Sequence, residues 1–488
     1  MAAAWLTRLP SFRGELSQDA KVLDIAELDF GKIRQRRPAV VLKPATVEDV
    51  VSAVQFCRRE GIALAARGSA HSAGAQMMAP EGLVIDMKSM GRVLSMGDDF
   101  VEVEGGIMWR QLLEATLERG LTPPVVTDWL GVTVGGTLSM GGFGFMSFHR
   151  GTQMDHILEL EVVTGEGERV TCSPTRNVEL FDAVRGTHGQ FGIIVRAKLA
   201  VERAPQAIQV TQCTYGDVRV MLADFMRLSR EVGTDLIHAF AAQKTEASIR
   251  TKMNSTERLN FRPEDVAAAI QSVRGPWVYN LEVCDLIPAE GKPRRAPLDP
   301  STLQCLPGLR DTWSMSWKEF CLRLPPLILE EQYRGAAPHP EICIFVPFAH
   351  APDFLASELE RLHPERDIGN GPVLIFPIDR RKVSPSLFML PQNDTHCLFF
   401  GLLRRADPPT PERIAQQLAD NERIYGAAQQ VGTVRYCCDV VPESAAFWKQ
   451  HFGPHWPRMV ELKRKYDPDS VLCSSWGRAT LEERGGKS

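Results

Sequence analysis

The stretch that decides the fold is TVGGTLSMGGFG at residues 133–144, in which five glycines fall between Gly135 and Gly144. Glycine brings no side chain to a core and costs backbone entropy on folding. Close approach of the backbone to a ligand therefore explains the stretch better than core packing does. The G-x-G-x-x-G spacing of a Rossmann turn, with its later acidic residue, is not met, and a Walker A sequence is absent. The segment thus predicts a ligand-binding loop of another type.

A second loop of small residues, RGSAHSAG at residues 67–74, directly follows the apolar run 62–66. Successive backbone N–H groups in such a loop form a concavity that suits a pyrophosphate. Taken alone, the loop is explained about as well by a tight turn with a surface histidine. The glycines of residues 133–144 favour ligand binding for both loops.

Together the two loops resemble those of the FAD-binding oxidoreductases of the vanillyl-alcohol oxidase type, and within them the cytokinin dehydrogenases. The first loop of that family reads Arg-Gly-Arg-Gly-His-Ser, which matches this chain at Arg67, Gly68, His71 and Ser72. The second matches at residues 127–130 and 132–139, and the similarity continues through residues 151–194 and again at residues 451–453 and 465–468.

The resemblance implies an α+β fold with a two-lobed FAD-binding domain of PCMH type and a substrate domain built on an antiparallel sheet flanked by helices. We expect the FAD-binding domain over residues 1–205, the substrate domain over 206–440, and a C-terminal segment, 441–488, that returns to the FAD-binding domain. The residue pattern agrees with this division. It predicts strands at 39–42, 62–66, 83–86, 100–104, 157–164 and 192–199, helices from Thr46 to Gly61 and at 108–119, then strands at 277–283, 342–346, 373–378 and 397–403, a helix at 218–232 and a helical stretch at 445–466.

The resemblance also implies which residues hold FAD. They are Arg67, Gly68, Ser69, Ala70, His71, Ser72, Gln76, Asp128, Thr133, Gly135, Gly136, Thr137, Ser139, Gly142, Gly192 and Ile194. His71 is expected to bond through a ring nitrogen to the C8 methyl carbon of the flavin. Ser69 and Ala70 depart from the usual Arg and Gly, and Gly131 occupies the place of the second attachment cysteine of bicovalent relatives, so one covalent bond is the expected maximum.

Asp128 is the predicted catalytic base. A hydride leaves a carbon readily only while a neighbouring N–H or O–H loses its proton, and a carboxylate buried beside the flavin can accept that proton. A turn or helix-cap aspartate is the commoner use of such a residue. The matching Thr-Asp-aromatic-Leu context favours the catalytic role.

Four further positions bear on the substrate. Glu282 resembles a glutamate at the substrate entrance of cytokinin dehydrogenases and is a second catalytic candidate, although an exposed strand carboxylate is an equal alternative. Glu341 and Cys343 replace Trp and Asn of the family, which predicts an altered pocket. Residues 474–477, SSWG, replace Ser-Pro-Gly-Gln. His188 stands where an apolar residue is usual, and a solvated loop histidine is the expected explanation.

Composition limits the partners. The formal net charge of −4, from 56 basic and 60 acidic residues, offers no excess with which to bind a nucleic-acid backbone. No apolar stretch approaches the ~20 residues that span a bilayer, and the short apolar start does not predict a signal peptide, so we expect a cytoplasmic protein without a membrane partner. The cysteines lack the spacing of a zinc site or a disulfide framework, and no metal is expected.

Three functions remain open from the sequence. The leading one is a cytokinin-dehydrogenase-like enzyme that oxidises the C–N bond of a small amine, an N6-alkyladenine, to an imine that is then hydrolysed. The second keeps the flavin chemistry but acts on a secondary-metabolite amine or alcohol, with O2 or a quinone-like molecule as the electron acceptor in either case. The third is a flavoprotein without catalysis, in which Asp128 is idle. Substrate, acceptor and oligomeric state do not follow from the sequence.

Overall fold

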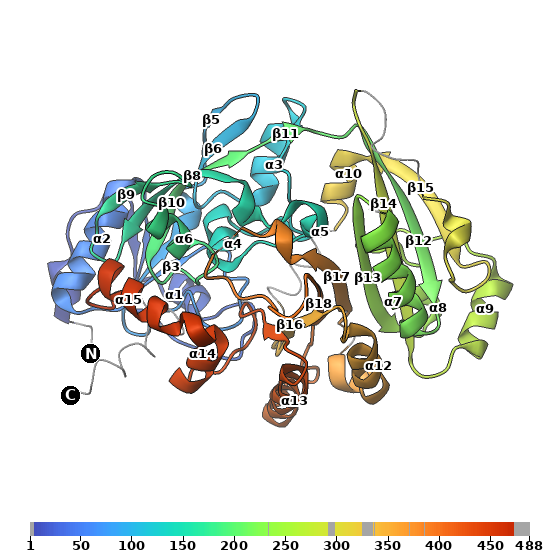
Figure 1. Cartoon of the computed structure of the whole chain (residues 1–488). Helices are drawn as coiled ribbons and strands as arrows, with labels where there is room; N and C mark the ends of the chain where they lie inside the picture. Colours follow the sequence, from blue (N-terminus) through green and yellow to red (C-terminus); the bar gives the residue numbers. More distant parts are fainter. Residues whose placement is uncertain are drawn as a thin grey trace.

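The computed structural model describes residues 4–232, 234–290, 298–324, 335, 337–369, 371–384 and 386–472. Residues 474–477, whose departure from the family pattern is noted above, lie outside this part of the chain. Three sheets carry the fold, two in the N-terminal part and one in the middle of the chain (Figure 1).

The first lobe is a small sheet in the order β1-β2-β4-β3, in which β2, β4 and β3 run parallel and β1 is antiparallel. Its helix α2 begins at the predicted capping box, since Thr46 and Asp49 bond to each other's backbone N–H groups, and it ends at Gly61 with φ +67°. The elements are β1 (Glu15–Ser17), α1 (Ala20–Ala26), β2 (Val40–Lys43), α2 (Val47–Glu60), β3 (Leu64–Arg67) and β4 (Leu83–Asp86).

The second lobe is an antiparallel five-stranded sheet in the order β5-β6-β10-β8-β9. Its strands are β5 (Val93–Met96), β6 (Phe100–Glu104), β8 (Ile157–Thr164), β9 (Arg169–Cys172) and β10 (Gly192–Ala200). Its helices are α3 (Trp109–Leu117), α4 (Val134–Met140), α5 (Ser147–Arg150) and α6 (Val178–Val184). A short pair, β7 (Leu121–Thr122) and β11 (Glu202–Arg203), connects this lobe to the next sheet.

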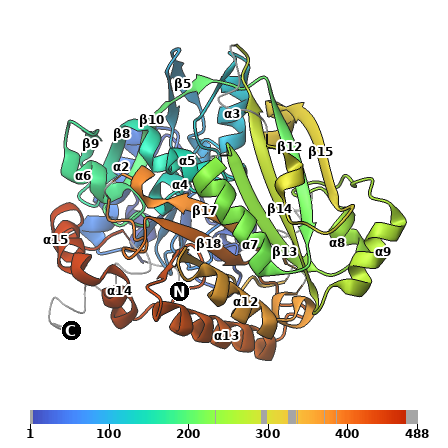
Figure 2. The same cartoon turned by 45° about the vertical axis from the view of Figure 1, so that its right-hand side comes forward.

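The middle of the chain forms one eight-stranded sheet in which every pairing is antiparallel, as predicted. In sheet order its strands are β15 (Arg310–Ser316), β12 (Ala207–Tyr215), β14 (Trp277–Ile287), β13 (Leu236–Gln243), β17 (Val373–Asp379), β18 (His396–Leu402), β16 (Ile342–Pro347) and β19 (Val434–Arg435). Helix α5 of the second lobe contacts β17, so the large sheet faces the lobes (Figure 2).

Helices flank the large sheet, and α7 contacts both β12 and β14. They are α7 (Val218–Arg227), α8 (Glu246–Arg250), α9 (Pro263–Ser272), α10 (Trp317–Leu322), α12 (Ala351–Arg361) and α13 (Pro411–Gln429). Among the described residues, none of the helices combines the length and the apolar character that crossing a membrane requires.

The last helices, α14 (Ala445–Phe452) and α15 (Trp456–Tyr466), return to the two lobes (Figure 1). Lys463 of α15 is fully buried and donates to the backbone carbonyls of Gln190 and Leu472, at 3.0 and 3.1 Å. Leu472 in turn forms a parallel bridge with Leu64 at the start of β3. The end of the described chain is therefore part of the core of both lobes.

Several elements differ from the sequence-based prediction. The helical stretch 445–466 is two helices, because Gly453 and Pro454 form a 3-10 turn between α14 and α15. Helix α3 is shorter at both ends than residues 108–119. Strands β12, β13 and β15 were not predicted, although β12 and β13 lie in the middle of the large sheet.

Candidate flavin and substrate site

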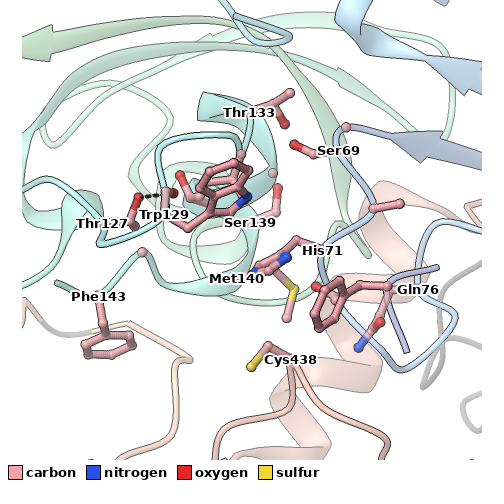
Figure 3. Close-up of a pocket in the computed structure, with 18 of the residues that line it drawn as sticks. Ser69, His71, Gln76, Thr127, Trp129, Thr133, Ser139, Met140, Phe143 and Cys438 are labelled. Atoms are coloured by element: carbon pink, nitrogen blue, oxygen red, sulfur yellow. Dashed lines mark hydrogen bonds between the residues drawn. The ribbon is translucent and has the colours of Figure 1, made fainter. Parts of the chain in front are cut away.

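One cavity of about 700 Å³ lies between the two lobes and the large sheet, and its size is typical of cofactor sites (Figure 3). Fifteen predicted site residues line it: Gly68, Ser69, Ala70, His71, Ser72, Gln76, Asp128, Thr133, Gly135, Gly136, Thr137, Ser139, Gly142, Gly192 and Ile194. Two predicted site residues, Arg67 and Glu282, do not line the cavity.

The two glycine-rich loops meet each other at one side of the cavity. A Cβ added to Gly68 would lie 2.1 Å from Thr133 Oγ1, and one added to Gly135 would lie 2.9 Å from the carbonyl oxygen of Gly105. Only glycine fits at these two positions, because a side chain would clash with another part of the same chain. At Gly189, by contrast, an added Cβ would meet no heavy atom within 4 Å. Gly189 is not one of the predicted glycines, however. Each of the five glycines between Gly135 and Gly144 has a protein atom within 3.0 Å of an added Cβ, so contact within the chain accounts for them, and the prediction that they make room for a ligand is not supported.

Arg67 lies behind the first loop. Its guanidinium donates to the carbonyl oxygen of Ile25 at 2.9 Å and to that of Ala26 at 3.5 Å, which ties the end of β3 to α1. The residue is 8% exposed and does not line the cavity. Arg67 therefore supports the first loop from behind. The sequence had instead predicted that it contacts the cofactor.

His71 lies in the cavity, near Met140 and Gln76 (Figure 3). Its ring is 4.7 Å from the ring of Phe30, which stacks on His339 at 4.4 Å. Burial, together with the nearby His339, lowers the pKa of His71 to about 4. The imidazole is therefore neutral near pH 7, which is the form in which a ring nitrogen has a free lone pair.

Asp128 lies half-buried in the loop between β7 and α4 and faces the same cavity. Its Oδ1 accepts a hydrogen bond of 2.8 Å from Asn254 Nδ2, which the middle of the chain supplies. Burial raises the pKa of Asp128, and the positive charges of His238 and Arg323 offset part of that rise. A carboxylate with a raised pKa in a cavity is suited to accept a proton.

Glu282 of β14 is not an exposed strand carboxylate, so that alternative was wrong, and it is not among the described residues that line the cavity. Its place at a substrate entrance stays a prediction. Glu282 is fully buried, with Oε1 2.7 Å from His238 Nε2, and it accepts two hydrogen bonds from Arg323, of 2.6 and 3.0 Å. Burial alone would raise its pKa, yet the charges of Arg323 and His238 hold the pKa at about 2. Glu282, His238 and Arg323 form what we call the buried ionic cluster.

The two substitutions relative to the family pattern, Glu341 and Cys343, both line the cavity. The carboxyl of Glu341 is 3.9 Å from His339 Nδ1. Burial and the neighbouring Asp439 raise the pKa of Glu341 to about 8. The cavity thus carries a second carboxyl group, which is largely protonated near pH 7.

His188 is not a solvated loop histidine, so that prediction was wrong. The residue is 7% exposed and lines the cavity, and its backbone N–H donates to the carbonyl oxygen of Ser139 at 2.8 Å. The turn of the chain after α6 therefore carries His188 inward.

Sequence reasoning missed five residues that shape the site: Phe30, His238, Asn254, Arg323 and His339. His339 lies two residues before Glu341, a position already compared with the family pattern, and that proximity could have marked it. The others lie far along the chain from the loops, and no local pattern distinguishes them.

The residues present fit FAD. The cavity is lined both by the small-residue loops and by aromatic residues, among them Phe143, Phe376 and Phe399. Such a lining suits a molecule that is polar at one end and has a flat ring system at the other. His188 also has a ring nitrogen without a hydrogen-bond partner in the described part of the chain.

Two family models match the chain. A FAD binding domain matches residues 38–173, and a domain described as "Cytokinin dehydrogenase 1, FAD and cytokinin binding" matches residues 205–477.

Full-length relatives agree with these models. An uncharacterised oxidoreductase in the fasciation locus of Rhodococcoides fascians is 32% identical over 459 residues, which cover 93% of this chain and 96% of the relative. Cytokinin dehydrogenase 6 of Oryza sativa subsp. japonica is 32% identical over 495 residues, with 95% and 91% covered. Cytokinin dehydrogenase 1 of Arabidopsis thaliana is 30% identical over 483 residues, with 94% and 81% covered. With its flavin-type cavity and these matches along nearly its whole length, the chain belongs to the cytokinin dehydrogenase family of FAD-dependent oxidoreductases.

Proposed function

We propose that the protein oxidises the C–N bond of a small amine, with an N6-alkyladenine as the leading substrate class. The single observation that carries the proposal is Asp128, a carboxylate with a raised pKa that faces the flavin-type cavity and is fixed by Asn254. The names of the cytokinin dehydrogenase relatives support the substrate class.

In this proposal Asp128 takes the proton from the substrate nitrogen while a hydride leaves the adjacent carbon. FAD, when bound, supplies the acceptor for that hydride. Asn254 holds Asp128 by one oxygen, and within the described part of the chain the other oxygen has no hydrogen bond and can accept the substrate N–H. The substrate loses one proton and one hydride in all and becomes an imine, which water then hydrolyses to an amine and a carbonyl compound.

A second substrate class, a secondary-metabolite amine or alcohol, is favoured by one specific observation. Glu341 and Cys343 line the cavity where the family pattern has Trp and Asn. A protonated carboxyl in place of an indole keeps one hydrogen-bond donor, adds acceptor oxygens and removes a large apolar surface. A cavity lined in this way suits a substrate whose polar group lies next to Glu341.

The experiment that separates these functions is anaerobic bleaching of the flavin absorbance. The purified protein is mixed with an N6-alkenyladenine, a small secondary amine without the purine, or the corresponding alcohol. Bleaching by the N6-alkenyladenine alone supports the first substrate class. Bleaching only by the other two supports the second, and no bleaching with any of them contradicts both. Re-oxidation by O2 or by a quinone then identifies the electron acceptor.

We also propose that His71 bonds covalently to the C8 methyl carbon of the flavin. One C–H bond of the methyl group and the imidazole N–H bond would break, and the two hydrogens with their electrons would pass to the electron acceptor, O2 or a quinone. The place of His71 in the cavity and its neutral ring support this, because an unprotonated nitrogen must form the bond. Acid precipitation should then leave the yellow colour in the pellet, and His71→Ala should release it into the supernatant. Complete release from the unmodified protein would refute the covalent bond and leave FAD binding intact.

A further inference from the structure

His188 has a backbone conformation that L-amino acids rarely adopt. Its φ is +63°, between two glycines, Gly186 and Gly189, whose φ values are +66° and +69°. Glycine adopts this region at no steric cost, and any side chain there is strained. At the middle of a turn that uses glycine twice, a histidine is thus the costlier choice.

The imidazole of His188 also lacks the hydrogen bonds that buried polar groups normally have. Its Nδ1 is sealed from water and has no partner in the described part of the chain, whereas Nε2 is not sealed in this way. The ring packs edge-on against Trp448, with the centroids 5.5 Å apart. Burial lowers the pKa of His188 to about 4, so the ring is neutral near pH 7 and carries one N–H.

The proton can lie on Nδ1 or on Nε2, and the free-energy cost of leaving a buried group unbonded differs between these two tautomers. A buried N–H without an acceptor is rarer than a buried acceptor without a donor. The proton is therefore expected on Nε2, the nitrogen that remains accessible. Since His188 lines the cavity, this N–H is available to a bound molecule.

Three costs thus meet at one residue: backbone strain, burial of a polar ring, and an unsatisfied ring nitrogen. Such outliers persist where they serve a function. The hydrogen bond from the His188 backbone to Ser139 fixes the residue beside the second glycine-rich loop, whose Gly136 and Ser139 line the same cavity. The cofactor that this loop holds is the nearest candidate for a partner.

We infer that His188 binds the cofactor, its Nε2–H donating a hydrogen bond to an acceptor oxygen of FAD. The family pattern has an apolar residue at this position, so the contact distinguishes this chain from its relatives. Because FAD binding is established for the family, the inference does not depend on which substrate is oxidised.

The test measures cofactor affinity and stability on the same variants. Apo-protein in a His71→Ala background, in which no covalent bond can form, is titrated into FAD while the quenching of flavin fluorescence gives Kd. His188→Gly relieves the backbone strain and removes the ring. We expect it to raise Kd about tenfold, which is the loss of one hydrogen bond, while the Tm of the apo-protein stays equal or rises.

Two further variants separate binding from folding. His188→Asn tolerates the same backbone region and keeps an N–H donor, so its Kd should lie between those of the parent and the glycine variant. Asn177→Gly relieves the same kind of strain, at φ +47°, at an exposed position that does not line the cavity, and should leave Kd unchanged. An unchanged Kd in His188→Gly overturns the inference. So does a fall in both Tm and affinity that His188→Asn does not restore.

Discussion

Asp128 and Glu282 are both carboxylates near the centre of the molecule, yet their surroundings differ in almost every respect. Asp128 faces the cavity with one hydrogen bond, from Asn254, and burial raises its pKa. Glu282 is fully buried with four polar contacts, one to His238, two from Arg323 and a weak one from Cys284. The charges of Arg323 and His238 hold its pKa at about 2. Near pH 7 Glu282 is therefore ionised and held by its partners, whereas the raised pKa of Asp128 suits it to exchange a proton. The environment, rather than the type of residue, sets the role.

The backbone differs between the same two regions. Three cavity-lining residues other than glycine, Ala70, His188 and Asn254, have φ between +56° and +63°. Glu282 and His238 lie in regular strands of the large sheet, paired directly across β14 and β13. Three of the eight non-glycine residues with positive φ in the described chain therefore line the cavity, whereas Glu282 and His238 lie in regular strands.

The largest expected effect comes from Asp128, the carboxylate that faces the cavity. Asp128→Asn keeps the shape but loses the basic lone pair, and general-base catalysis contributes ~10²–10⁴-fold. Reduction of the flavin by a saturating substrate should slow by that factor, which corresponds to roughly 3–5 kcal/mol of barrier. Anaerobic stopped-flow absorbance measures the rate.

Flavin content and Tm of Asp128→Asn should remain unchanged. A variant that reduces within a few-fold of the parent would make Asp128 a structural residue. One that loses FAD would give it a role in the fold, and either result would remove the contrast with Glu282.

The second effect concerns stability. Glu282→Gln leaves the buried Arg323 without its counter-charge, and breaking such a pair costs about 3–5 kcal/mol. Urea unfolding should show this loss. Between pH 4.5 and 2 the wild type loses stability as Glu282 takes up a proton, because its folded pKa lies below its ordinary value of 4.5. The Gln variant should lack this contribution.

Two comparisons check that result. Glu257→Gln, which is exposed, should change stability by less than about 0.5 kcal/mol. Replacing Glu282 and Arg323 together by leucine should recover part of the loss, since no unpaired charge remains. A Glu282→Gln protein of normal stability but altered KM would instead place Glu282 in substrate binding.

A smaller shift is expected in the pH profile of Asn254→Ala. The Asn254 hydrogen bond favours the ionised form of Asp128, so its loss raises the pKa of Asp128 further. The rate of flavin reduction falls as pH drops through that pKa. The acid limb should therefore move to higher pH by about one unit, the equivalent of one hydrogen bond to a charged group. If the acid limb of the pH profile stays in place while the rate of flavin reduction falls at all pH values, Asn254 has only a packing role.

The smallest effect tests the strain in the cavity wall. Ala70 has φ +58°, where the family pattern has glycine. Ala70→Gly should stabilise the protein by about 1 kcal/mol, as measured by urea unfolding. Ala73→Gly, in the same loop but without a positive φ, should destabilise it. Equal effects of both substitutions would show that the wall is not strained at Ala70.

Much of the fold could be predicted because its signals are local. The capping box at Thr46 and the apolar runs that become β4 and β8 depend on residues adjacent in sequence. The division of 445–466 into two helices was also readable, since Gly453-Pro454 disfavours a continuous helix. Strands β12 and β13 have no clear apolar run, since polar residues interrupt the pattern in β12 and alanines interrupt it in β13. These segments are strands because they pair with β14 in the large sheet.

The site was predictable where loops touch the cavity and not where distant segments meet. His71 and Asp128 lie in matched segments, and both line the cavity. The partner of Glu282, Arg323, is 41 positions away, and that of Asp128, Asn254, is 126 positions away. His188 was misjudged because a short turn with glycines usually lies at the surface. Only tertiary packing turns it inward.

The return of the last helices has a consequence for how the protein is made. Leu472 lines the cavity and bridges Leu64, while Lys463 bonds to the chain at Gln190. On the ribosome the two lobes emerge first, and this closing segment emerges only after the whole large sheet. A nascent chain therefore displays both glycine-rich loops long before the wall behind them exists. A chain truncated before residue 456 would keep both loops but lack Leu472 in the cavity lining and the Lys463 bond that ties the segment to Gln190.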